Sequence, residues 1–219
     1  MKNTTAFSAE EYDEKIKQTL PYYEEFYKQI ADAVGTYFDR KVAWLDVGCG
    51  PGKMAELGLE LSHRFALCDI SADMLKVARA RVVSEKAEFI LSPAQEIEYE
   101  NEFDVVTAIQ TFHYLPPEER KKTVRKCYRA LKPGGMFITF ENFAPDTGCG
   151  KRLYLERWKR YQIERGRSER ESRNHILRYG KDYFPITIDE HKKVMKESGF
   201  EAVELLWCSY MQAGFIGIK

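Results

Sequence analysis

The chain has 219 residues, of which 44% are hydrophobic, and its 34 basic residues balance its 34 acidic ones. This is enough apolar material for one sizeable core, while the balanced charge does not favour nucleic acid as a partner, although a local basic face stays open. No apolar run is long enough to cross a bilayer. Residues 1–11 lack the basic-then-apolar layout of a signal peptide, so we expect a cytoplasmic protein with no membrane partner.

Five cysteines form an odd set without a close C-x-x-C pair. Cys68 and Cys127 fall inside apolar patterns, which favours buried thiols in a reducing compartment. We therefore expect no metal site.

The first two thirds of the chain alternate between helical and strand patterns. Residues 10–34 have a tyrosine-rich helical pattern, in which Pro21 predicts either two helices or a kinked one. Buried strands are then predicted at 41–47, 64–70, 88–91, 103–109 and 136–140. Helices are predicted between them: one after the GCGPG turn, one capped by Ser71 and one opened by Pro116 and Pro117. This alternation is typical of a parallel sheet covered on both faces.

The last third of the chain departs from that rhythm. Residues 144–185 are polar and charged with interleaved aromatics, and we expect helices that project from the sheet. Thr187 opens a capping-box helix, and strands at 201–209 and 211–218 must pair as an antiparallel hairpin. The prediction is an α/β, Rossmann-like, mostly parallel seven-stranded sheet with helices on both faces and a C-terminal antiparallel hairpin. We expect one domain over 1–219, with a helical lid at 1–38 and a helical insertion at 144–185 on the acceptor side.

The most informative motif is LDVGCGPG at residues 45–52. A glycine-rich turn between strand and helix lets the backbone approach a ligand, at the edge where open α/β sheets bind them. In a dinucleotide-binding G-x-G-x-x-G pattern the third glycine would stand at position 53, which is occupied by Lys53. The sequence therefore gives less support to a pyrophosphate-binding site. Asp69 stands 21 positions after Gly48, as a ribose-binding acid does. S-adenosylmethionine carries a ribose without a pyrophosphate, although a tight connection and a helix-capping Asp69 remain the simpler alternatives.

Four segments, LDVGCGPG, CDIS, FDVVTAIQTFHYL and ALKPGG, resemble class I S-adenosylmethionine-dependent methyltransferases over residues 42–140. The resemblance implies S-adenosylmethionine as the cofactor, with Tyr23 as a cover and Cys49 among the binding residues. It further implies that the methionine portion contacts Asp46, Gly48, Gly50 and Gly52, and that the ribose contacts Asp69. The adenine would contact Ile70, Met74, Ala94 and Gln95, and the sulfonium would lie beside Gln110.

The flanks YDEKIKQTLPYYEEFY, ERKKTVRKCYRALKPGG and MQAGFIGIK are similar to carboxy-S-adenosylmethionine synthases and their relatives. Those enzymes convert S-adenosylmethionine and prephenate into a carboxylated cofactor for tRNA wobble-uridine modification. This resemblance implies an arginine that holds the added carboxylate, for which Arg173 is the nearest candidate. The turn GCGPGK is closer to ordinary methyltransferases, so simple methyl transfer is the preferred hypothesis.

His113 follows a strand where active sites of such sheets open, and it could take a proton from an acceptor. Packing or a backbone hydrogen bond is an equal alternative. Glu141 and Asn142 point toward the same edge, as acceptor contacts or as caps. The charged run 151–173 is a solvated helix face, an acceptor lid or an RNA contact, and the first is preferred.

Three functions stay open: a small-molecule methyltransferase, a carboxylated-cofactor synthase and a non-catalytic S-adenosylmethionine-binding protein. A small-molecule acceptor is the expected partner, and the protein is expected to be a monomer or a homodimer.

Overall fold

The computed structural model describes residues 7–219. It contains one seven-stranded sheet in the order β3-β2-β1-β4-β5-β7-β6. The strands are β1 (Val42–Val47), β2 (Ser62–Asp69), β3 (Ala87–Leu91), β4 (Phe103–Ile109), β5 (Leu131–Asn142), β6 (Ala202–Ser209) and β7 (Gln212–Ile218). The strand pairs from β3 through β5 are parallel, and β7 is antiparallel to both β5 and β6. The predicted fold class is therefore confirmed.

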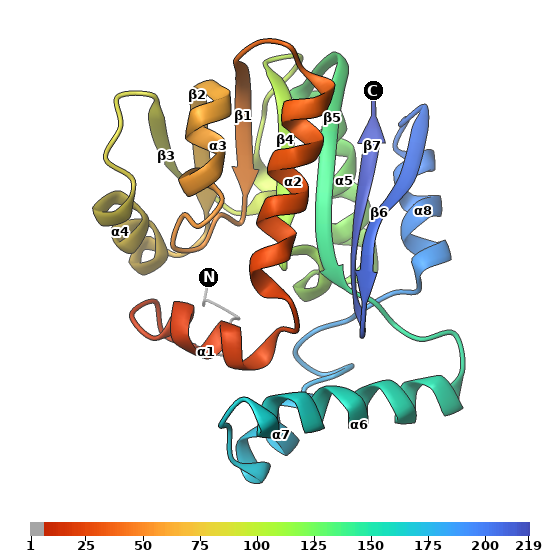
Figure 1. Ribbon diagram of the computed structural model, residues 1–219. Coiled ribbons are helices and arrows are strands. Elements are labelled where there is room, and N and C mark those ends of the chain that lie inside the picture. The colour runs from red at the N-terminus through yellow and green to blue at the C-terminus, as the bar shows by residue number, and fades with distance from the viewer. Residues whose placement is uncertain (1–6) are drawn as a thin grey trace.

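Helices cover both faces of the sheet (Figure 1). One face carries α2 (Tyr23–Tyr37), α3 (Ala55–Leu61) and α4 (Ala72–Arg81), and the other carries α5 (Pro117–Ala130) and α8 (Ile188–Glu197). Alternate side chains of the central strands enter the two layers: Trp44 packs with the first group, and Leu45 with the second. Both side chains are fully buried, as expected for a parallel sheet with two covered faces.

Three further helices lie beyond the carboxyl ends of the parallel strands (Figure 1). They are α1 (Tyr12–Thr19), α6 (Gly148–Glu164) and α7 (Glu169–Ile176). The indole nitrogen of Trp158 on α6 donates to the Thr19 carbonyl at 2.6 Å, which joins the insertion to the N-terminal segment. Short 3₁₀ helices follow β3 (η1, Ala94–Glu96) and β4 (η2, Phe112–Tyr114).

Most local signals acted as predicted. Pro21 separates α1 from α2, Ser71 accepts from the Met74 amide, and Thr187 forms a complete capping box. Leu57 of α3 is 39% exposed, and the buried residues of this helix are Ala55 and Gly58.

The lid and insertion roles predicted for 1–38 and 144–185 stay predictions, and residues 1–6 of the first segment lie outside the described residues. Cys68 and Cys127 are buried free thiols, as predicted. Across residues 7–219 no helix is long and apolar enough to cross a membrane, and no group of three acidic, histidine or cysteine side chains is arranged to hold a metal ion.

Candidate active site

The glycine turn leaves β1 at the carboxyl edge of the sheet and folds back over β2. The amides of Gly48 and Cys49 both donate to the Cys68 carbonyl, at 2.7 and 3.0 Å. Gly48 has φ +69°, and a Cβ there would lie 2.3 Å from the Thr111 hydroxyl, so only glycine fits. Gly50 has φ +52°, but a Cβ there would meet nothing within 4 Å. The backbone at Gly50 therefore borders open space, as a ligand-binding turn should.

Asp69 ends β2 and braces this turn. Its Oδ2 accepts from the Gly50 amide and its Oδ1 from the Ser71 amide, each at 2.8 Å. Burial raises the pKa of the Asp69 carboxyl, although these amides oppose the shift. Each oxygen retains a second lone pair, so Asp69 can shape the turn and also accept from a ligand hydroxyl.

Asp46, near the end of β1, is 2% exposed. Its Oδ1 accepts from the Thr107 hydroxyl at 2.7 Å, and that hydroxyl accepts from the Trp44 indole nitrogen at 3.0 Å. Burial raises the pKa of Asp46 to about 7, and the nearby Asp69 adds to the effect. No ion pair to Asp46 occurs among residues 7–219, so its charge is uncompensated at neutral pH.

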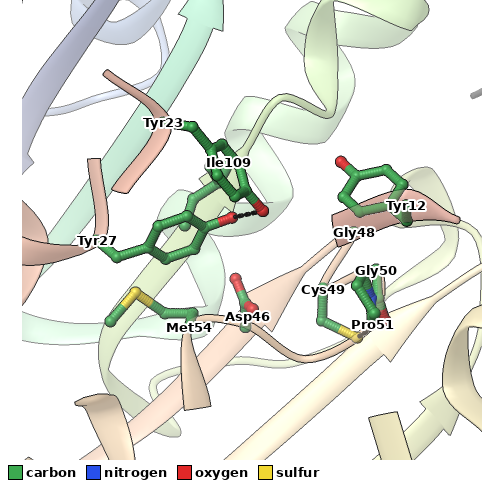
Figure 2. A pocket seen from close by; sticks show the side chains of 10 residues that line it. All are labelled: Tyr12, Tyr23, Tyr27, Asp46, Gly48, Cys49, Gly50, Pro51, Met54 and Ile109. Carbon is green, nitrogen blue, oxygen red and sulfur yellow. Dashed lines mark hydrogen bonds between the residues drawn. The ribbon is translucent and has the colours of Figure 1, made fainter. Parts of the chain in front are cut away.

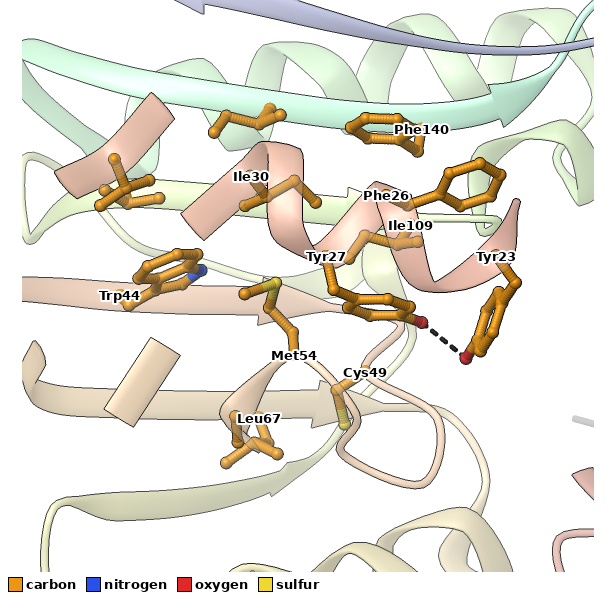
Figure 3. Close-up of a cluster of buried hydrophobic side chains, with 14 of the residues drawn as sticks. Tyr23, Phe26, Tyr27, Ile30, Trp44, Cys49, Met54, Leu67, Ile109 and Phe140 are labelled. Carbon is orange, nitrogen blue, oxygen red and sulfur yellow. Dashed lines mark hydrogen bonds between the residues drawn. The ribbon is translucent and has the colours of Figure 1, made fainter. Parts of the chain in front are cut away.

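A first cavity, with about 280 Å³ of empty space, opens between the glycine turn and the tyrosines of α1 and α2 (Figure 2). The Tyr27 hydroxyl donates to the Tyr23 hydroxyl at 2.7 Å across its roof. Both tyrosines belong to the hydrophobic cluster between α2 and the sheet (Figure 3). The lining residues are Tyr12, Tyr23, Tyr27, Asp46, Gly48, Cys49, Gly50, Pro51, Met54 and Ile109.

A second cavity, with about 350 Å³ of empty space, lies beside the first and shares Tyr12 with it. Gln110 enters its wall from the end of β4, with φ +55° and its amide donating to the Phe140 carbonyl at 2.6 Å. The lining residues are Phe7, Tyr12, Ile16, Thr19, Leu20, Gln110, Tyr114, Asn142, Trp158 and His175. Residues of the N-terminal segment, of α6 and of α7 thus enclose the second cavity at the carboxyl edge of the sheet.

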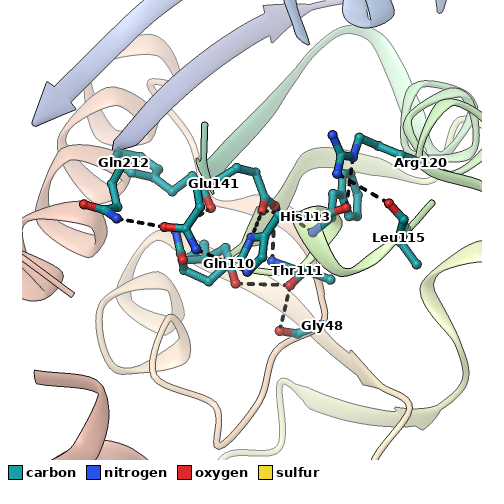
Figure 4. Close-up of polar contacts among 12 residues, drawn as sticks. Gly48, Gln110, Thr111, His113, Leu115, Arg120, Glu141 and Gln212 are labelled. Carbon is teal, nitrogen blue, oxygen red and sulfur yellow. Dashed lines mark hydrogen bonds and ion pairs between the residues drawn. The ribbon is translucent and has the colours of Figure 1, made fainter. Parts of the chain in front are cut away.

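His113 is 2% exposed and lies behind the wall of the second cavity. Its Nδ1 lies 2.5 Å from Oε2 of Glu141, and its Nε2 lies 3.3 Å from the side-chain nitrogen of Asn142 (Figure 4). Asn142 in turn accepts from Gln212 at 2.8 Å. Both ring nitrogens are therefore engaged by the protein, and Asn142 stands between His113 and the cavity.

The predicted site residues fall into three groups. Tyr23, Asp46, Gly48, Cys49 and Gly50 line the first cavity, and Gln110 lines the second. The remaining predicted residues border neither cavity: Gly52, Asp69, Ile70, Met74, Ala94, Gln95 and His113. Arg173 is exposed on α7, away from both lining sets.

Tyr12, Tyr27 and His175 line the cavities but were not among the predicted site residues. The tyrosine-rich pattern of residues 10–34 was the available signal for the first two. His175 lies in the polar segment 144–185, for which only projecting helices were predicted.

Comparisons with known proteins agree with this geometry. Residues 45–139 match the family model described as a methyltransferase domain. They include the glycine turn, Asp69 and Gln110. This part of the chain is similar to methyltransferase domains.

Curated relatives extend the similarity beyond residues 45–139 to the flanks. The carboxy-S-adenosyl-L-methionine synthase of Wolinella succinogenes is 28% identical over 95% of this chain and 89% of its own length. The protein of the same name from Staphylococcus epidermidis is 22% identical over 97% of this chain and 94% of its own. Both predicted resemblances are therefore confirmed as similarities.

Among solved structures, the Burkholderia thailandensis 1,6-didemethyltoxoflavin-N1-methyltransferase superposes with a TM-score of 0.64 at 15% identity. The match covers 96% of this chain and 84% of that one. That structure holds 1,6-didemethyltoxoflavin and S-adenosylhomocysteine. At this identity the likeness shows a shared fold.

Proposed function

We propose that the protein is an S-adenosylmethionine-dependent methyltransferase that binds its cofactor in the first cavity and a small-molecule acceptor in the second. The observation that carries the proposal is that both cavities open at the carboxyl edge of a methyltransferase-type sheet and share Tyr12. Open α/β sheets bind their ligands at this edge.

The residues of the first cavity fit this cofactor. Asp46 is a carboxyl whose pKa is raised by burial, and an amino group beside it would offset the cost of its charge. Gly50 offers bare backbone next to open space. Outside the lining of this cavity, Asp69 has acceptor capacity for a ribose hydroxyl, and Ile70, Met74, Ala94 and Gln95 remain our proposal for the adenine side.

The bound cofactor supplies an activated methyl group, so the protein's task is mainly alignment. Gln110 lines the wall of the second cavity, where it can position the acceptor. Tyr12, Tyr23 and Trp158 close the two cavities and would exclude water. The supporting role of His113 is to hold Asn142, whose side chain lines the acceptor cavity.

The carboxylated-cofactor synthase is the second candidate, because relatives bearing that name match nearly the whole chain. Against it, no arginine lines either cavity, and Arg173 is exposed. The presence of a second cavity also speaks against a non-catalytic S-adenosylmethionine-binding protein. We further propose a cytoplasmic location, a monomer or homodimer, and no requirement for nucleic acid.

Calorimetric titration with S-adenosylmethionine tests the proposal. We expect micromolar binding, on the order of −8 kcal/mol, and clear weakening in Asp69→Ala. Asp73→Ala, at an exposed position in the first turn of α4, is the matched control and should bind normally. A folded, ligand-free wild-type protein that binds no S-adenosylmethionine would refute the assignment. Mass spectrometry of any copurified ligand separates a carboxylated cofactor from the ordinary one.

A further inference from the structure

Among the described lining residues of the second cavity, one is a histidine, His175 on α7. His175 is 8% exposed, and Trp158 packs against it edge-on with ring centroids 4.9 Å apart. The side-chain nitrogen of Gln162, a fully buried residue of α6, lies 3.2 Å from its Nδ1. When that amide donates to Nδ1, the ring proton is on Nε2, and the Gln162 Oε1 stays buried without a partner among the described residues. In this tautomer the ring can offer an N–H to a molecule in the cavity.

Two arginines stand close to this ring. Arg167 donates to the Thr19 hydroxyl at 2.6 Å, and Thr19 lines the cavity. Arg178 pairs with Asp182 at 2.8 Å and lies beside Tyr114, another lining residue. Burial, and after it the charges of the two arginines, lowers the pKa of His175 to about 3. The ring is therefore neutral, and the potential around it is positive.

The charge of Arg167 is only partly offset within the described structure, by Glu171 and by the ring of Phe7, whose centroid lies 5.4 Å from its Cζ. Its Nε is buried without a hydrogen-bond partner among residues 7–219, and no ion pair to it is formed there. Burial lowers the pKa of its guanidinium, with only Glu171 acting in the other direction. An anion in the neighbouring cavity would relieve this imbalance.

The rest of the cavity wall contains no carboxylate among its described lining residues, and most of it is ring or aliphatic carbon. Tyr12, Tyr114 and Trp158 offer flat surfaces of the kind that hold a planar ligand. Gln110 and Asn142 add uncharged polar groups at the side nearest the sheet. A ring-shaped ligand with one anionic oxygen matches this distribution.

We propose that His175 is a specificity-determining residue, which donates a hydrogen bond from Nε2 to an anionic oxygen, a carboxylate or phenolate, of a cyclic acceptor. The inference rests on the proposed function, because it gives the second cavity to the acceptor. Gln162 is then a positioning residue that sets the ring tautomer. Arg167 and Arg178 act through the field that favours the acceptor's anionic form.

The test uses the full-length protein saturated with S-adenosylhomocysteine and three probes: benzoate, its uncharged isostere benzamide, and 2,4-dinitrophenolate. Calorimetry should show benzoate or dinitrophenolate binding at least tenfold more tightly than benzamide. The tighter of the two anions identifies the carboxylate or the phenolate as the preferred group.

His175→Leu should reduce the preference for the anion to within about twofold, and His175→Gln should restore part of it because the amide can donate. His63→Leu, the same change at an exposed histidine of β2, should leave the preference intact. Arg167→Met leaves the His175 ring in place and should weaken anion binding several-fold. This variant replaces His175→Leu in the test if His175→Leu does not fold.

Equal binding of benzamide and both anions, or an unchanged preference in a folded His175→Leu, would overturn the inference. Binding of S-adenosylhomocysteine without any of the three probes would overturn it too, while leaving the proposed function standing. Failure to bind S-adenosylhomocysteine would instead remove the proposed function itself.

Discussion

The carboxylate of Glu141, at the end of β5, lies 2.5 Å from Nδ1 of His113, which follows β4. The same carboxylate accepts from the backbone amides of Thr111, Phe112 and His113 at 2.8 to 3.1 Å. One buried side chain thus fixes the turn that carries Gln110 and Tyr114 toward the second cavity (Figure 4).

Replacing Glu141 by Gln should destabilise the protein by about 2–4 kcal/mol, because a buried network loses a charged acceptor and leaves donors unpaired. Burial opposes the charged form of Glu141, but His113, the Phe112 amide and Arg120 outweigh it, so its pKa lies below the usual value. A lowered folded-state pKa contributes stability that is present above the unfolded pKa, about 4.3, and is lost as the pH falls through the folded value.

Urea unfolding of both proteins between pH 3 and 8 measures this contribution. The gap in unfolding free energy should be widest at neutral pH and should narrow below about pH 4. A gap independent of pH would mean that the charge of Glu141 adds nothing to stability.

Whereas Glu141→Gln should destabilise the protein at neutral pH, Asp46→Asn should stabilise the ligand-free protein at high pH. The folded-state pKa of Asp46 is raised to about 7 by burial, so its ionisation costs stability as the pH rises from about 4 toward 7. The amide oxygen introduced by the substitution can still accept from the Thr107 hydroxyl. Without ligand, the variant should therefore be more stable than wild type at pH 8 by up to about 3 kcal/mol.

The same variant should bind S-adenosylmethionine more weakly, since it removes the proposed partner of the cofactor's amino group. Thermal melts at pH 5 and pH 8, with and without S-adenosylmethionine, check both statements. A variant less stable than wild type at pH 8 without ligand would contradict the first. Unchanged affinity would contradict the second.

The strands and the glycine turn could be predicted because their signals are local. An apolar run such as residues 103–109 has one stable environment, a buried strand, and β4 has those bounds. The KPGG segment misled the prediction of β5, which begins at Leu131 directly after α5. Proline and glycine usually mark turns, whereas here they occupy the first part of the strand, near the register shift between Phe103 and Val105.

The cavity walls could be predicted only in part, because tertiary packing decides them. Tyr12 and His175 are far apart in the chain. Both line the second cavity because α6 packs on α1, where Trp158 donates a hydrogen bond to the Thr19 carbonyl. Nothing local to residues 169–176 distinguishes the buried His175 from the exposed Arg173 beside it except helical phase. Helical phase predicts which residues are buried only when the covered face of the helix is known, and a polar segment does not reveal that face.

Arg120 ties the insertion to the sheet. It is 3% exposed, and its guanidinium donates to the carbonyls of Phe112, Leu115 and Phe184. Arg120→Met should leave one buried and two partly buried carbonyls short of a donor and cost about 2–4 kcal/mol. Amide hydrogen exchange should quicken at residues 183–186 more than in β1. Uniform acceleration across the sheet would instead indicate a global effect.

Two neighbouring glycines of the turn should respond differently to alanine. At Gly48 the added Cβ would meet the Thr111 hydroxyl at 2.3 Å, and φ is +69°, so Gly48→Ala should cost several kcal/mol and impair folding itself.

At Gly50 the Cβ would meet no protein atom within 4 Å, and only the φ of +52° is unfavourable. Gly50→Ala should therefore cost about 1–2 kcal/mol but weaken S-adenosylmethionine binding at least tenfold, because the methyl would occupy the proposed ligand space. Chemical denaturation and calorimetry on both variants separate the two effects. A Gly50→Ala protein that binds S-adenosylmethionine normally would show that the cofactor does not approach the turn at this residue.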